Sequence, residues 1–184
     1  MLANEPCSFG KLCQLHAYES DRSYQYSPSQ LAYSGRIGER PTTSGGTIRS
    51  TYQKRGPADL AILGIGPGKT CHIGFNEHGS TNDSVTRYVQ LDSETKEVNK
   101  RFFDNPRDMP EGAITMGIAT ILSAKEIVVI TKGGEKAWGV HRSLTGPIGS
   151  DAPASYLRYH PNVTFLLDKN AADLLDKNNI TPRS

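Results

Sequence analysis

Short apolar runs that alternate with helical patterns constrain the fold of this chain more than any other feature. From residue 56 onward, five segments have the length and the β-branched or apolar content of strands: Asp59–Ile65, Thr86–Leu91, Ala113–Met116, Glu126–Thr131 and Val163–Leu167. The first of these runs is stopped by a Gly-Pro-Gly sequence, which is typical of a buried strand that ends in a loop.

Helical patterns occupy the segments between these strands. We expect helices from Asp92 or Ser93 to about Phe103, over Gly117–Ala124, over Gly134–Leu144 and over Ala171–Leu175. Alternating strands and helices imply parallel βαβ units. The predicted fold class is therefore α/β, a doubly wound, mostly parallel sheet with helices on both faces (Rossmann-like). In such sheets ligands bind beyond the carboxyl ends of the strands, where loops 66–80, 117–120 and 132–136 are expected.

The chain of 184 residues has the length of one domain but changes character near residue 56. Residues 1–55 are rich in Ser, Gly and Arg and contain almost no aliphatic run, so we predict a divergent, loop-rich N-terminal segment without a core strand. Residues 56–184 form the predicted α/β domain.

Charge and apolar patterning exclude several classes of partner. The formal net charge is +2, from 21 basic and 19 acidic residues, and no basic tract with interleaved aromatics is present, which argues against nucleic acid. The apolar stretches Leu60–Ile65 and Ile127–Ile130 are too short to span a bilayer, and the start of the chain lacks an apolar signal region. Three cysteines without CxxC spacing favour a reduced, cytoplasmic protein with no zinc site.

The segment Gly64–Ser80, GIGPGKTCHIGFNEHGS, carries the densest chemistry. It places His72 and Glu77 five residues apart on a glycine-rich loop after a strand. A histidine is suited to move protons near neutral pH, and a nearby carboxylate can orient it. The spacing alone is not diagnostic, because a surface histidine beside a solvated glutamate gives the same pattern.

The letters GPGKT within this segment invite a nucleotide-binding interpretation. A phosphate-binding P-loop needs a glycine five residues before its second glycine, and that position is Leu63 here. The sequence after Thr70 is also a poor helix start. An ATP or GTP site is therefore not favoured.

The loop resembles the signature loop of the glucosamine-6-phosphate deaminase/isomerase family, within the 6-phosphogluconolactonase-like superfamily. The likeness continues in order over about residues 52–175. Its further segments are Val85–Arg87, Asn99–Phe103, Met109–Leu122, Ile127–Ile130, Gly133 with Lys136 and Ala137, Pro153–Ser155 with His160, and Asp168 with Ala171. No single segment is specific, but together they are.

The resemblance implies conversion of glucosamine 6-phosphate to fructose 6-phosphate and ammonia by ring opening, aldose–ketose isomerisation and deamination. It implies no metal and no cofactor, a small phosphosugar as partner, and a homo-oligomer. The resemblance implies that His72 transfers a proton in ring opening and that Glu77 supports it. Arg101 and Lys136 are implied to bind the phosphate. Arg87 is implied to make an allosteric contact, and Gly64 and Gly66 to form the loop backbone of the site. A planar guanidinium and an ammonium near a helix start suit a phosphate dianion.

Two departures from the family pattern stand out. The family usually has Asp or Asn, then Gly, before the histidine, whereas this chain has Thr70 and Cys71 in a loop about two residues longer. Because Thr70 carries no charge, we expect His72 to be oriented less firmly. Residues 1–58 also lack the family's first strand with its Gly-Ser-Thr loop and the Asp-Glu-Tyr segment, so the proton-abstracting aspartate is not assigned.

Other functions remain open at this stage. A non-catalytic phosphosugar-binding protein would bind the phosphosugar through Arg101 and Lys136 without turnover. An inactive truncated homologue would neither bind it nor convert it. A sister activity such as lactone hydrolysis is compatible with the same fold, although Glu77 favours the deaminase. We expect His141 and His160 to be structural or exposed, without a role in chemistry or metal binding.

Overall fold

The computed structural model of the chain describes residues 13–17, 50, 54, 56–100, 103, 105 and 109–175. Residue Arg101 and most of the predicted N-terminal segment lie outside this part of the chain.

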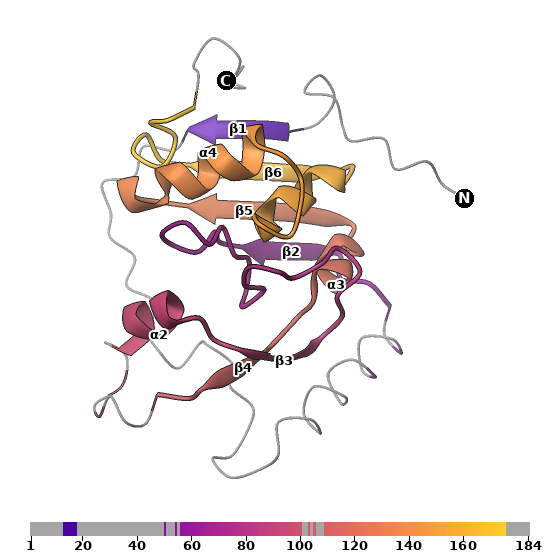
Figure 1. Ribbon diagram of the computed structural model, residues 1–184. Coiled ribbons are helices and arrows are strands. Elements are labelled where there is room, and N and C mark those ends of the chain that lie inside the picture. The colour runs from indigo at the N-terminus through magenta and orange to yellow at the C-terminus, as the bar shows by residue number, and fades with distance from the viewer. Residues whose placement is uncertain are drawn as a thin grey trace.

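The centre of the fold is a parallel sheet with the strand order β1 (Cys13–Ala17), β6 (Val163–Leu167), β5 (Glu126–Thr131), β2 (Leu60–Leu63) (Figure 1). The bounds of β5 and β6 agree with the sequence prediction, and β2 lies within the predicted run. The parallel pairing and the interleaved helices confirm the α/β class.

Strand β1 corrects the prediction that residues 1–55 contribute no core strand. It pairs in parallel with β6, from Cys13 opposite Val163 to Ala17 opposite Leu167. Its sequence, CQLHA, is too short and too polar to show a clear strand periodicity. The strand becomes recognisable only from its pairing with β6, which is a long-range interaction.

A second, two-stranded sheet contains β3 (Arg87–Gln90) and β4 (Gly112–Thr115), which pair antiparallel. These are the strands predicted over 86–91 and 113–116. They pair with each other instead of extending the parallel sheet. The pairing brings β3 beside the segment that leads from β4 into the next helix.

The helices are α2 (Ser93–Asn99), α3 (Ile118–Leu122), the short 3₁₀ helix η4 (Gly134–Lys136) that leads into α4 (Ala137–Thr145), and a second 3₁₀ helix η5 (Pro153–Tyr159). The sequence did not predict η5. The prediction of a helix over 171–175 is wrong, because these residues form turns. The Asp168 carboxylate accepts the Ala171 N–H at 2.8 Å, as an N-cap residue does, but the backbone bonds that follow have i→i+3 spacing, from the Asp173 N–H to the Asn170 carbonyl at 3.3 Å and from the Leu175 N–H to the Ala172 carbonyl at 3.0 Å.

One face of the parallel sheet carries the core. Buried side chains of β5 and β6, such as Val129 and Phe165, belong to one apolar cluster with residues of α3, α4 and η5. On the opposite face, Leu60, Ile62 and Ile130 are 47%, 65% and 49% exposed. The described helices therefore cover one face of the sheet. None of the helices in the described residues is long and apolar enough to cross a membrane.

Candidate functional site

The loop between β2 and β3 is held in place at the carboxyl end of the parallel sheet. The Gly66 N–H donates to the His72 carbonyl at 2.8 Å, and the Ala154 N–H, from η5, donates to the Cys71 carbonyl at 2.9 Å. Ile65 and Ile73 form a β-bridge within the loop. These backbone contacts fix the first half of the loop, over residues 65–73.

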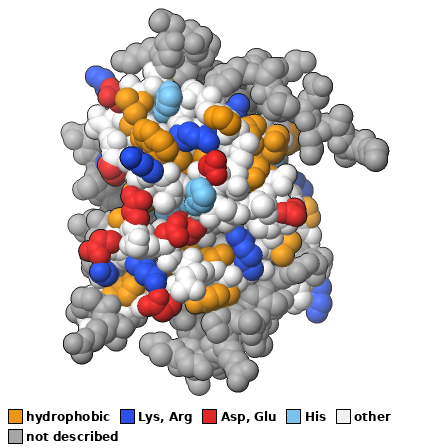
Figure 2. Space-filling model, in the orientation of Figure 1, with side chains coloured by type: hydrophobic (Ala, Val, Ile, Leu, Met, Phe, Trp, Pro, Cys, Tyr) orange, Lys and Arg blue, Asp and Glu red, His pale blue; other side chains and the backbone are white. Residues whose placement is uncertain are grey.

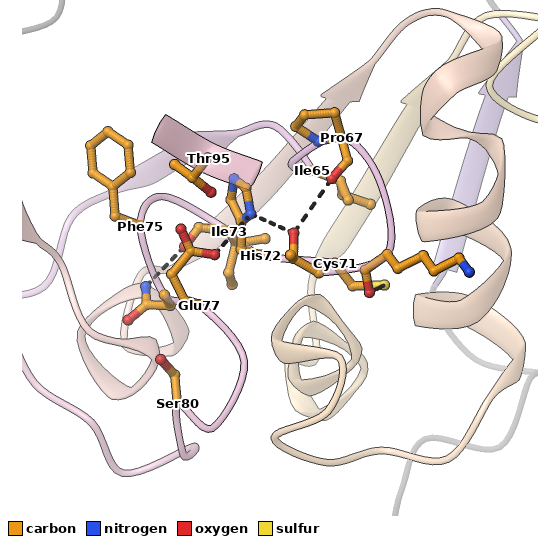
Figure 3. A network of polar contacts seen from close by, with 12 residues as sticks. Ile65, Pro67, Cys71, His72, Ile73, Phe75, Glu77, Ser80 and Thr95 are labelled. Atoms are coloured by element: carbon orange, nitrogen blue, oxygen red, sulfur yellow. Dashed lines mark hydrogen bonds and ion pairs between the residues drawn. The ribbon is translucent and has the colours of Figure 1, made fainter. Parts of the chain in front are cut away.

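The structure brings the sequence-predicted pair of His72 and Glu77 together. The two side chains point toward each other, with Nδ1 of His72 3.2 Å from Oε2 of Glu77 (Figure 3). His72 is 8% exposed and Glu77 is 6% exposed. A buried histidine–carboxylate pair is a common arrangement for proton transfer.

Thr70 contacts the same ring nitrogen. Its Oγ1 lies 2.7 Å from Nδ1 of His72, and its hydroxyl also reaches the Pro67 carbonyl at 3.4 Å. Thr70 thus contacts the ring although it carries no charge, and the expectation that His72 is less firmly oriented than with the family's carboxylate or amide stays a prediction.

Gly66 is required by the position of the imidazole. A Cβ on this residue would lie 2.1 Å from both Cε1 and Nε2 of His72. Gly64 is not constrained in this way, since a Cβ there would meet only the Ile130 carbonyl at 3.5 Å. Of the two glycines predicted as loop backbone, only Gly66 lies against the functional histidine.

Cys71 has a backbone conformation that is unusual for a residue with a side chain. Its φ is +49°, in the left-handed region, and its side chain is fully buried. Burial raises the pKa of its thiol, although Ser143 and the charge of Arg142 oppose this. Cys71 is therefore a packing residue rather than a reactive thiol.

Asn76, which was not predicted as a site residue from the sequence, holds the second half of the loop. Its Nδ2 donates to the carbonyls of Ile73 at 2.9 Å and Met116 at 2.7 Å, and the residue is fully buried. Its Oδ1 accepts from Nη1 of Arg87 at 2.8 Å. The amide therefore ties the Glu77 loop to β3 and to the end of β4.

Arg87, predicted as an allosteric contact, braces this loop from β3. Besides Asn76, its guanidinium donates from Nη2 to Ser80 Oγ at 2.8 Å. The allosteric role stays a prediction, and these contacts give the residue a structural role as well.

Lys136 lies at the same end of the sheet as His72. Its Nζ donates to the Ile65 carbonyl at 2.9 Å, one residue before Gly66. The segment that carries it is anchored by Asp168, whose carboxylate oxygens accept the Gly133 N–H at 3.1 and 3.2 Å. This places the ammonium beside the His72 loop, whereas Arg101, the other predicted phosphate ligand, lies outside the described residues.

Further lysines follow the carboxyl ends of the parallel strands. Lys69 comes after β2, Lys132 after β5 and Lys169 after β6, and all three are exposed. On the face shown in Figure 2, both Lys or Arg and Asp or Glu side chains surround the pale-blue histidine near its centre. Such a set of cations raises the local concentration of anionic ligands.

The environment of Glu77 keeps it ionised. Burial raises the pKa of Glu77, but attraction to the His72 ring and to the Thr95 hydroxyl outweighs burial, so its pKa lies below the ordinary value. Within the described residues, both carboxylate oxygens and Thr95 Oγ1 lack a hydrogen bond of good geometry. The 3.2 Å contact with His72 therefore becomes an ion pair only when the imidazole carries a second proton.

A second carboxyl group, that of Asp92, precedes α2 beside this pair. Burial and the negative charge of Glu77 raise the pKa of Asp92, while the charges of His72 and His78 act in the opposite direction. Two carboxylates that share one neighbourhood are driven toward different protonation states.

His160 lies at the opposite end of the sheet. Its Nε2 contacts the Ala124 carbonyl at 2.7 Å, just before β5 begins, and its Nδ1 accepts the Asn162 N–H at 3.1 Å. Both ring nitrogens are used structurally. Among the residues described, no group of three or more His, Cys, Asp or Glu side chains is placed to hold a metal ion.

The lowered pKa of Glu77 predicts an acid-dependent loss of stability. Its ionised form stabilises the fold above the unfolded pKa, near 4.5, and this contribution is lost as the pH falls through the lower folded value. We expect the free energy of unfolding, measured with urea, to fall less steeply below pH 4.5 in Glu77→Gln than in the wild type. The exposed Glu97→Gln is the matched control and should follow the wild type. A Glu77→Gln curve parallel to the wild-type curve would contradict this assignment.

These features define an α/β protein with a buried histidine–carboxylate pair and several lysines at the carboxyl edge of its sheet. Comparisons with known proteins give this class a family. The chain is 53% identical over 134 residues to a glucosamine-6-phosphate deaminase from Rhodopirellula baltica, covering 73% of this chain and 53% of that protein. It is 40% identical over 162 residues to a glucosamine-6-phosphate deaminase from Lactobacillus delbrueckii subsp. bulgaricus, covering 87% of this chain and 68% of that protein. The chain belongs to the glucosamine-6-phosphate deaminase family.

Solved structures agree with this assignment. A monomeric glucosamine-6-phosphate deaminase matches with a TM-score of 0.68 and 40% identity, over 72% of this chain and 54% of that one. A 6-phosphogluconolactonase from Trypanosoma brucei matches with a TM-score of 0.52 and 22% identity, over 75% of this chain and 56% of that one, which supports the Rossmann-like fold alone. No protein-family model matches the chain. The chain spans about half the length of several of these relatives.

Proposed function

We propose that this chain converts glucosamine 6-phosphate and water to fructose 6-phosphate and ammonia. The observation that carries the proposal is the buried His72–Glu77 pair, which lies at the carboxyl edge of the sheet next to the Lys136 ammonium. The family to which the chain belongs supplies the reaction. The site supplies the groups that its first step needs.

In the first step His72 transfers a proton between the anomeric hydroxyl and the ring oxygen of the sugar, which opens the ring. Glu77 stays ionised and stabilises the ring of His72 when it carries an additional proton. Later a proton moves from C2 to C1, and water replaces the amine at C2 to release ammonia. We assign no residue to the abstraction of the C2 proton.

The phosphate of the substrate is proposed to bind between Lys136 and Arg101. Support comes from the position of Lys136 beside Ile65 and from the exposed lysines after β2, β5 and β6. An ammonium next to backbone N–H groups at a helix start suits a phosphate dianion. Arg87 is proposed to contribute to an allosteric phosphosugar contact in addition to its bracing role.

The activity is tested by measuring ammonia and fructose 6-phosphate from glucosamine 6-phosphate, beside a binding titration. We expect turnover that His72→Asn reduces by about 100-fold or more, since general acid–base catalysis contributes roughly 10²–10⁴-fold. The exposed His141→Asn is the control and should keep full activity. Binding without turnover supports instead a non-catalytic phosphosugar-binding protein, and the absence of both supports an inactive homologue.

Two further properties are proposals. We propose a cytoplasmic location, which the three cysteines without CxxC spacing support, and a homo-oligomer, which the exposed Leu60, Ile62 and Ile130 support. The solved relative at 40% identity is a monomeric enzyme. Light scattering of the purified chain measures the oligomeric state, and a monomer mass would contradict the proposal.

A further inference from the structure

We propose that Thr70 is a positioning residue that determines which nitrogen of His72 acts as the base. The inference deepens the proposed function, on which its catalytic meaning rests, and it starts from the surroundings of one atom. Nδ1 of His72 has two oxygen neighbours, Thr70 Oγ1 at 2.7 Å and Glu77 Oε2 at 3.2 Å.

Both neighbours favour a proton on Nδ1, Thr70 through a hydrogen-bond contact and Glu77 through its negative charge at 3.2 Å. An ionised carboxylate such as Glu77 can only accept a hydrogen bond. A threonine hydroxyl has one proton to donate, and the Pro67 carbonyl, at 3.4 Å, is positioned to accept it. With the hydroxyl proton directed at the Pro67 carbonyl, the lone pairs of Thr70 Oγ1 face Nδ1, and this arrangement favours a proton on Nδ1.

The remaining ring nitrogen is therefore the basic one. With Nδ1 protonated, the neutral imidazole keeps its free lone pair on Nε2. The face of the ring lies against Gly66, where a Cβ would be 2.1 Å from both Cε1 and Nε2, so this contact fixes the plane of the ring. In the proposed reaction Nε2 is then the atom that takes the proton from the anomeric hydroxyl and returns it to the ring oxygen of the sugar.

Thr70 contributes more to this choice than Glu77 does. Its contact with Nδ1 is the shorter one and has hydrogen-bond geometry, whereas the Glu77 oxygens lack such a partner among the described residues. Thr70 is also close in sequence to His72 and lies in the same fixed loop. A hydroxyl at this position sets the tautomer without adding a second negative charge next to Glu77.

The test is ¹⁵N NMR of ring-labelled histidine in the free protein, at a pH where His72 is neutral. We expect wild-type His72 to show the Nδ1–H tautomer. In Thr70→Val, which keeps the branched shape and removes the hydroxyl, the ratio of Nδ1–H to Nε2–H should fall by about fivefold, the equivalent of roughly 1 kcal/mol for one hydrogen bond. Thr70→Ser should restore the wild-type ratio.

Thr145→Val is the matched control, because Thr145 Oγ1 lies 3.3 Å from Nε2 of the exposed His141. It should leave the His72 signals unchanged. An Nε2–H tautomer in the wild type, an unchanged ratio in Thr70→Val, or no restoration by serine would overturn the inference. The measurement needs neither substrate nor turnover, so its failure is distinct from a failure of the proposed deaminase activity.

Discussion

Gly66→Ala is expected to displace the His72 imidazole and to remove most of the turnover that depends on it. The new methyl group would lie 2.1 Å from Cε1 and Nε2 of the ring, so the ring or the loop must move. A misplacement of about 1 Å can cost roughly 100-fold in rate. Overpacking of a buried site also lowers the free energy of unfolding by about 1–3 kcal/mol.

Ammonia release and urea unfolding measure the two effects of Gly66→Ala. Gly149→Ala is the control, since a Cβ at that position meets nothing within 4 Å and its φ is not in the left-handed region. We expect the control to remain close to the wild type in both measurements. Equal behaviour of the two variants would show that the His72 ring does not lie against Gly66.

Asn76→Ala is expected to cause the largest loss of stability among the substitutions considered. It removes three hydrogen bonds, to the Ile73 and Met116 carbonyls and to the Arg87 guanidinium, at a fully buried position. A neutral hydrogen bond contributes about 1 kcal/mol and one to a charged group about 1.5–3 kcal/mol, so the free energy of unfolding should fall by about 3 kcal/mol or more. Urea unfolding of the full chain measures this change.

The exposed Asn82→Ala is the control for this prediction. A surface substitution of this kind should change the free energy of unfolding by no more than about 0.5 kcal/mol. Losses of similar size in the two variants would mean that Asn76 does not hold the loop.

The elements that the sequence predicted well are those with strong local signals. EIVVIT forms β5 and VTFLL forms β6 as predicted, because β-branched and apolar residues dominate both runs. Strand β1 and the antiparallel pairing of β3 with β4 depend on partners far away in the sequence, which local patterns do not report. The residues over 171–175, which were predicted as a helix, form turns in which Asp173 and Leu175 donate to carbonyls three residues earlier.

The residues proposed to carry the chemistry of the site were predictable from the sequence, whereas the residues that hold them in place were not. His72 and Glu77 were identified from the motif and its family resemblance, and the structure places them in contact. The role of Asn76 was missed because an asparagine in a loop has no sequence signal for burial. Thr70 was interpreted only as the loss of the family's carboxylate or amide at this position. A hydroxyl two residues before a histidine can nevertheless reach its ring nitrogen.

The central claim is that His72, Glu77 and Lys136 belong to one phosphosugar site, and ring-labelled histidine NMR tests it most directly. The chain has only five histidines, and His160, at the opposite end of the sheet, is an internal reference. On addition of glucosamine 6-phosphate, the account predicts a shift of the His72 signals, an unchanged His160 and a weaker response in Lys136→Ala. Saturable binding of the sugar phosphate that leaves the His72 signals in place would contradict it.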